Sequence, residues 1–129
     1  MLHGEITQRI IRAFYDVYNT LGYGFLERVY ENALKRELES SGMRVDQQVK
    51  IDVFYEGAQV GTYRADLVVE HSVIVEIKSS EGLRPEHAAQ LTNYLRATRC
   101  EVGLLLNFGK RAEFERRYFT NDRKRISRA

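Results

Sequence analysis

The chain has 129 residues, of which 43% are apolar and 29% charged, and its formal net charge is +2. That length fits a single domain over residues 1–129, with a core large enough to fold without disulfides or metal staples. There is no bilayer-spanning apolar run, no secretion-signal pattern and no second cysteine to pair with Cys100, so we expect a cytoplasmic, bacterial-type protein.

The N-terminal part of the chain predicts two amphipathic helices. Apolar residues recur at three- and four-residue spacing from Ile6 to Leu21, which is the period of a helix with one buried face. Gly22-Tyr23-Gly24 ends this helix. A second helix is expected over about residues 26–40, with Gly42 as the residue that ends it.

The middle of the chain predicts three consecutive strands. Alternation with a period of two begins at Gln48 and runs to Tyr55, and Glu56-Gly57 is a turn signal. Strands over about Val60–Glu70 and Val73–Lys78 follow. Their centres are continuously apolar, which is typical of strands covered on both faces, so helices should flank the sheet.

The remaining elements complete a mixed α/β (α+β) domain. Pro85 fits the first turn of a helix that runs to about Thr98, Val102–Phe108 reads as a buried strand, and Phe114–Phe119 could form an edge strand. The order ααβββαβ(β) predicts a central mixed sheet of four to five strands flanked by helices. The strand–helix–strand unit implies one parallel pair with a right-handed crossover.

Three charged residues, Asp66, Glu76 and Lys78, occupy strand positions otherwise filled by Val, Ile and Leu. Burying such ions costs several kcal/mol each, so they should be paired, hydrated or bound to a cation. Asp66 and Glu76 share a face only if the intervening loop has an odd length, such as residues 70–72, or if a bulge corrects the register. Two carboxylates on one face suit Mg²⁺. The scattered residues His3, His71 and His87 do not suggest zinc.

These residues carry a resemblance to a known family. Asp66…Glu76-x-Lys78, together with the order of helices and strands, resembles the PD-(D/E)XK nuclease superfamily and its restriction-endonuclease-like core. Gly24-x-x-Glu27-x-x-Tyr30 resembles the signature of the GxxExxY proteins, a branch of that superfamily. Gln90-x-x-x-Tyr94 is similar to a motif of RecB-like nucleases. Ala65 stands where the family has its name-giving proline, which contributes no ligand.

The resemblance implies a nuclease that hydrolyses phosphodiester bonds, with DNA as the expected substrate and Mg²⁺ or Mn²⁺ as cofactor. It implies that the metal is held by Asp66, Glu76, the Ile77 carbonyl and Glu27, the last directly or through water. Lys78 would orient the attacking water or stabilise developing negative charge. Gln90 and Tyr94 lie one helical turn apart, and they would brace the lysine or touch the substrate.

Plainer interpretations stay open for each residue. Glu27 could simply favour the helix dipole, Asp66 could pair with Arg64, and Glu76 and Lys78 could form a cross-strand ion pair. Gln90 and Tyr94 could be an ordinary helix pair, and Tyr30 a core residue. The alternative function is a catalytically silent module on the same fold that binds nucleic acid or another protein.

The C-terminal tail, about residues 120–129, is basic. With the preceding strand it carries six cations against the single acid Asp122: Arg116, Arg117, Arg123, Lys124, Arg125 and Arg128. Such a tail could hold phosphates or be a solvated chain end. A domain this small has little surface for reading a substrate, so we expect a homodimer or a partner protein.

Overall fold

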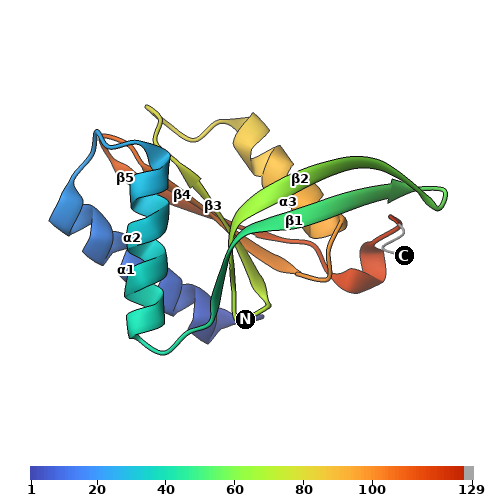
Figure 1. The fold of residues 1–129 in the computed structure, drawn as a ribbon, viewed down its shortest axis with the longest axis horizontal. Coiled ribbons are helices and arrows are strands. Elements are labelled where there is room, and N and C mark those ends of the chain that lie inside the picture. The colour runs from blue at the N-terminus through green and yellow to red at the C-terminus, as the bar shows by residue number, and fades with distance from the viewer. Residues whose placement is uncertain (127–129) are drawn as a thin grey trace.

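A computed structural model describes residues 1–126 of the chain. It confirms the predicted mixed α/β fold, with its elements arranged in the order shown in Figure 1. They are α1 (Gly4–Leu21), α2 (Glu27–Ser40), β1 (Val45–Tyr55), β2 (Ala58–Val69), β3 (Val73–Lys78), α3 (Pro85–Arg96), β4 (Val102–Phe108), β5 (Ala112–Tyr118) and the short 3₁₀ helix η1 (Asn121–Arg123). Within the described residues, none of the helices combines the length and apolar character that spanning a membrane requires.

The five strands form one mixed sheet whose spatial order, β1-β2-β3-β4-β5, follows the chain. β3 and β4 pair in parallel and are connected through α3, as the strand–helix–strand pattern predicts, while the other neighbours are antiparallel. β5 is the expected edge strand. β3 and β4 begin and end at the residues expected from their apolar runs.

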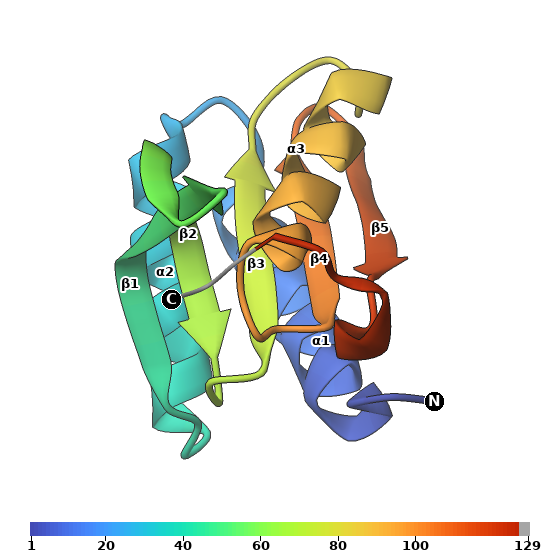
Figure 2. The ribbon, with the colours of Figure 1, turned by 90° about the vertical axis from the view of Figure 1, so that its right-hand side faces the viewer.

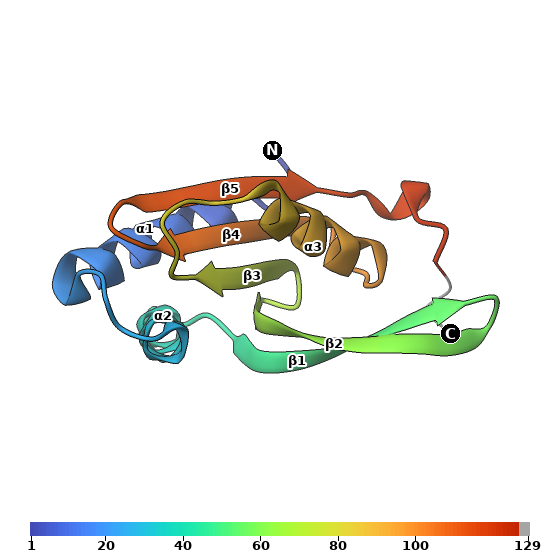
Figure 3. The same ribbon diagram turned by 90° about the horizontal axis from the view of Figure 1, so that it is seen from above.

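Helices cover both faces of the sheet, as Figures 2 and 3 show. α1 and α2 pack on one face, where the ring of Tyr30 stacks on Phe108 at 4.4 Å and Phe14 meets Phe108 edge-on at 4.7 Å. α3 packs on the other face, where Leu91 and Leu95 are fully buried. Two separate apolar cores therefore hold the sheet between them.

The hairpin of β1 and β2 changes sides halfway along its length. Leu67 belongs to the core under α1 and α2, whereas Ala65 belongs to the core under α3. In β1, Val45 and Ile51 divide between the two cores in the same way. Residues an even number apart on a regular strand share a face, so both strands must twist out of regular alternation between these positions.

The change of side occurs at Gln48 and Asp66. Gln47 pairs with Leu67 and Val49 pairs with Ala65, but Gln48 and Asp66 are missing from the ladder between them. Gln48 has a φ of 54°, the left-handed region that a residue with a Cβ seldom occupies. Beyond this point residues 49–65, here called the arm, extend away from the body of the sheet (Figure 1).

Part of the basic tail packs against the domain. The guanidinium groups of Arg96 and Arg123 both lie over the Phe119 ring, with their carbons 5.0 and 4.8 Å from its centroid. The Lys124 ammonium donates hydrogen bonds to the carbonyls of Thr98 and Cys100. Arg128 lies outside the described residues, and phosphate binding by the tail stays a prediction.

The loop after β3 is fixed by a buried side chain from β4. Asn107 is fully buried; its Oδ1 accepts the Ser80 amide at 3.0 Å, and its Nδ2 donates to the Ser80 carbonyl at 3.0 Å. The backbone of Ser80 also lies so close to Gly109 that a Cβ there would be 2.0 Å from the Ser80 oxygen. The chain leaving Lys78 is therefore held against the end of β4.

Asn107→Ala should lower the free energy of unfolding by about 2–4 kcal/mol, because it removes a buried side chain and leaves two partly buried backbone groups of Ser80 without partners. Urea denaturation followed by circular dichroism measures this change. Asn19→Ala, on the exposed side of α1, is the matched control and should shift stability by less than about 0.5 kcal/mol. Equal effects of the two substitutions would contradict this role of Asn107.

Candidate active site

The site lies where β2 and β3 stop pairing. The ladder between them runs from Val69↔Val73 to Leu67↔Val75, and one further step in the same register places Asp66 opposite Glu76. The connecting loop is residues 70–72, with Glu70 and His71 at positive φ. The predicted odd-length loop is therefore confirmed, and it brings the two carboxylates together.

The two acids replace the backbone ladder with a reciprocal exchange of hydrogen bonds. The Asp66 amide donates to Glu76 Oε2 at 2.7 Å, and the Ile77 amide donates to Asp66 Oδ2 at 2.7 Å. Each carboxylate thus accepts an amide from the opposite strand. This arrangement holds both side chains on rigid elements at the fork between the strands.

Burial makes negative charge costly here. Glu76 is only 4% exposed, and burial, reinforced by the nearby Asp66 charge, raises its pKa to about 8. Burial likewise raises the pKa of Asp66. A buried acid beside a partly buried one, both with raised pKa values, forms a site at which a cation would stabilise the ionised form.

Glu76 and Lys78 share the face of β3 that carries Ile74, which belongs to the core under α3. The Lys78 ammonium lowers the pKa of both acids, which places its charge close to them. Burial, followed by the Glu76 and Asp66 charges, raises the pKa of Tyr94 to about 12. The structure therefore brings Asp66, Glu76, Lys78 and Tyr94 together on the α3 side of the sheet.

Several polar atoms at this site have no protein partner. Within residues 1–126, no hydrogen bond is made by Glu76 Oε1, the Lys78 ammonium, the Gln90 amide or the Tyr94 hydroxyl, and none of these atoms is sealed from solvent. Gln90 and Tyr94 thus form no hydrogen bond to Lys78. Contact with a substrate, the other role expected of them, stays a prediction.

Glu27 lies at the margin of this group. Its carboxylate is exposed and accepts the Ser79 amide at 3.0 Å, which joins the start of α2 to the chain leaving β3. Among the residues that the structure describes, no group of three His, Cys, Asp or Glu side chains is placed to hold a metal ion. Glu27 as a third acid of a metal site stays a prediction.

The sequence analysis missed a second acid on the same helix. Glu31 is only 3% exposed, and its charge contributes to raising the pKa of both Asp66 and Glu76. The guanidinium of Arg28 lies 3.5 Å from its carboxylate. A signal existed in the sequence, because Glu31 stands three and seven residues before Leu34 and Leu38, on the buried stripe of α2.

Gln48 connects this buried acid to the site. Its Nε2 donates to Glu31 at 3.0 Å and to Asp66 Oδ1 at 3.3 Å. The strained backbone of Gln48 is therefore compensated by side-chain contacts with two carboxylates. Sequence reasoning also missed Gln48, because its only local signal was the start of an alternating strand.

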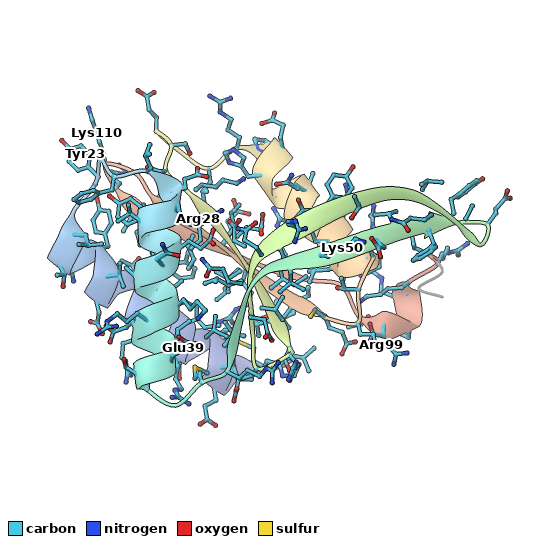
Figure 4. The ribbon with its side chains drawn as sticks, viewed as in Figure 1. Tyr23, Arg28, Glu39, Lys50, Arg99 and Lys110 are labelled. Atoms are coloured by element: carbon cyan, nitrogen blue, oxygen red, sulfur yellow. The ribbon has the colours of Figure 1, made fainter. Side chains whose placement is uncertain are left out.

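Exposed cations lie on the arm and at the start of α2. Lys50 and Arg64 are paired across the arm, and the Arg64 guanidinium donates to the Gln48 carbonyl at 3.1 Å. Figure 4 shows Arg28 on α2 and Lys50 on the arm, on either side of the region where the arm leaves the sheet. Arg28, Lys50 and Arg64 are here called the positive rim.

Comparisons with known proteins agree with this architecture. A family model described as "PD-(D/E)XK nuclease superfamily" matches residues 4–118. The solved structure titled "Crystal structure of SSO0001" aligns with a TM-score of 0.60 and 19% identity. The alignment covers 87% of this chain and 62% of that one, so the chain spans less than two thirds of that protein's length. At this identity the likeness concerns the fold. No curated protein matches the chain.

The Glu76 contribution to the free energy of unfolding should fall as pH rises from about 4.5 towards 8, in buffer free of divalent ions. The unfolded chain loses this proton near the ordinary value of 4.5, while the folded protein retains it until about 8. The slope is at most about 1.4 kcal/mol per pH unit. Urea titrations across this range measure it.

Glu76→Gln should flatten that slope and stabilise the protein at pH 8. Glu56→Gln, an exposed acid in the turn of the arm, is the matched control and should leave the slope unchanged. A wild-type protein whose stability rises over this range, with no difference from Glu76→Gln, would contradict the assignment.

Proposed function

The chain belongs to the PD-(D/E)XK nuclease superfamily, and from that premise we propose that it is a metal-dependent nuclease that hydrolyses phosphodiester bonds in DNA. The observation that carries the proposal is the acid pair Asp66 and Glu76, fixed by reciprocal hydrogen bonds beside Lys78. A module that only binds has no need for two paired carboxylates on adjacent strands, one of which, Glu76, keeps an oxygen without a protein partner. We expect it to act in the cytoplasm, as a homodimer or with a partner protein.

The donor set fits a hard divalent cation. Mg²⁺ commonly takes one or two protein carboxylates and completes its shell with water and substrate oxygens. Asp66 and Glu76 would hold Mg²⁺ or Mn²⁺, with the Ile77 carbonyl as a further oxygen ligand and Glu27 reaching it through water. When bound, such an ion polarises a phosphate and lowers the pKa of coordinated water.

The remaining residues act directly on the substrate. The Lys78 ammonium, on the same face as Glu76, stabilises negative charge that develops on the phosphate or orients the attacking water. Gln90 and Tyr94 lie one turn apart on α3, and their unpaired polar atoms contact the DNA strand. The cations of the positive rim attract the phosphate backbone.

We propose that the chain belongs to the GxxExxY branch, and the hydrogen bonds made by this motif support the proposal. The Tyr30 hydroxyl donates to the Gly22 carbonyl at 2.6 Å and accepts the Phe25 amide at 3.2 Å. Gly24 between them has a φ of 110°, which suits glycine. The motif therefore builds the corner from which Glu27 reaches the chain after β3.

Purified protein should cleave plasmid or oligonucleotide DNA with Mg²⁺ or Mn²⁺, and EDTA should abolish cleavage. Asp66→Asn and Glu76→Gln should lose both cleavage and the rise in melting temperature that Mg²⁺ gives the wild type. Lys78→Met should cut cleavage by at least about 100-fold while keeping the Mg²⁺-dependent rise in melting temperature.

Glu39→Gln is the matched control, since this acid lies near the far end of α2 and pairs with Lys35. It should retain full cleavage. Tight DNA binding without cleavage in any metal would instead support the silent binding module. Cleavage that persists in EDTA, or in the Glu76→Gln variant, would contradict the proposed metal-dependent mechanism.

The double substitution Lys50→Ala and Arg64→Ala should weaken DNA binding and flatten its salt dependence by about two counterions, whatever the sequence of the DNA. Fluorescence anisotropy across a salt series measures both effects. Lys110→Ala is the control, because Figure 4 places Lys110 far from Lys50. An unchanged salt slope in the double variant would remove the arm from the DNA interface.

A further inference from the structure

A cavity of about 490 Å³ lies between the arm and α3. Val53 and Tyr63 line it from the arm, and Gln90, Asn93 and Tyr94 line it from α3. Its size is within the range of pockets that take small organic groups, about 300–1,000 Å³. The cavity exists because the hairpin changes sides at Gln48 and carries Tyr63 over the helix.

The lining suits a planar ring with hydrogen-bonding edges. Tyr63 is 50% exposed, and its ring lies 5.7 Å from that of Tyr94, so part of its surface is available for stacking. Gln90 and Asn93 offer neutral amides. The lining has one acid, Glu86, and one cation, Arg96, whose guanidinium already lies over the Phe119 ring. An anion would find little to bind here.

Tyr94 connects this cavity to the acid pair. Its ring contacts Tyr63 inside the cavity, and its hydroxyl lies within the electrostatic reach of Glu76 and Asp66. Gln90 lines the cavity from the same face of α3. A nucleotide with its phosphate at the acids would therefore direct its base towards Tyr63.

We propose that this cavity binds one unpaired nucleobase of the DNA strand, stacked on Tyr63, and that the substrate is single-stranded DNA or DNA with unpaired nucleotides. The inference rests on the proposed function for the position of the phosphate. A base inside a duplex is already stacked and paired, so it would have to leave the helix to enter. Stacking on an aromatic ring tolerates any base.

The test uses a single-stranded oligodeoxynucleotide carrying 2-aminopurine, whose fluorescence falls on stacking, and the duplex of the same sequence. Binding is measured with Mg²⁺ in the Lys78→Met background, where cleavage is expected to be at least about 100-fold slower, and gel analysis verifies that the DNA is intact at the end of each titration. The single strand should bind more tightly than the duplex, and its 2-aminopurine should be quenched. Tyr63→Ala should lose the quenching and about 5- to 100-fold in affinity for the single strand, with duplex binding unchanged.

Tyr63→Phe keeps the ring and should stay within about twofold of the parent. Tyr55→Ala, which removes an exposed tyrosine at the end of β1 outside the cavity, is the matched control and should also stay within that limit. Equal binding of single strand and duplex, or full quenching in Tyr63→Ala, would overturn the inference. Absence of cleavage by the wild type in every metal would overturn the proposed function alone, since the binding measurements do not depend on turnover.

Discussion

The site depends on one reciprocal interaction, in which Asp66 and Glu76 each accept a backbone amide from the opposite strand. The exchange satisfies two amides that the ladder abandons where β2 and β3 separate. It also fixes two carboxylates at a buried fork, where their ionisation is costly without a counterion. The proposed active site therefore lies where a diverging hairpin must satisfy its own backbone amides, and the two flanking cores stabilise the sheet around it.

The change of side in the β1–β2 hairpin gives the site its surroundings. The hairpin residues before Gln48 and after Asp66 pack in the core with α2, whereas the arm packs in the core with α3. One distortion therefore has two consequences. It places the Gln48 side chain in contact with Glu31 and Asp66, and it places Tyr63 opposite α3 across the cavity. The one left-handed residue of this region thus lies beside the acid pair, and strained residues are often found at active sites.

The sequence predicted the parts of this arrangement that local rules govern. The apolar runs of β3 and β4 predicted where these strands begin and end. If Asp66 and Glu76 share a face, the pleat of the strands predicts an odd-length loop or a bulge between them, and the structure has the odd-length loop. Glu31 and Gln48 could not be predicted with the same certainty. Their roles depend on contacts between α2 and β1, which are separate elements of the chain. The left-handed conformation of Gln48 also has no sequence signal, because no glycine or asparagine stands at that position.

The chain that leaves β3 explains why the helix signature and the strand motif belong together. Glu27 accepts the Ser79 amide from the α2 side, and Asn107 binds both backbone groups of Ser80 from β4. Lys78 therefore directly precedes a segment whose backbone is hydrogen-bonded to both α2 and β4, and these contacts fix the backbone at the end of β3. In the proposed mechanism the Lys78 ammonium meets developing negative charge, and such preorganisation would favour that role. Glu27 thus has a positioning role that holds whether or not it also reaches a metal.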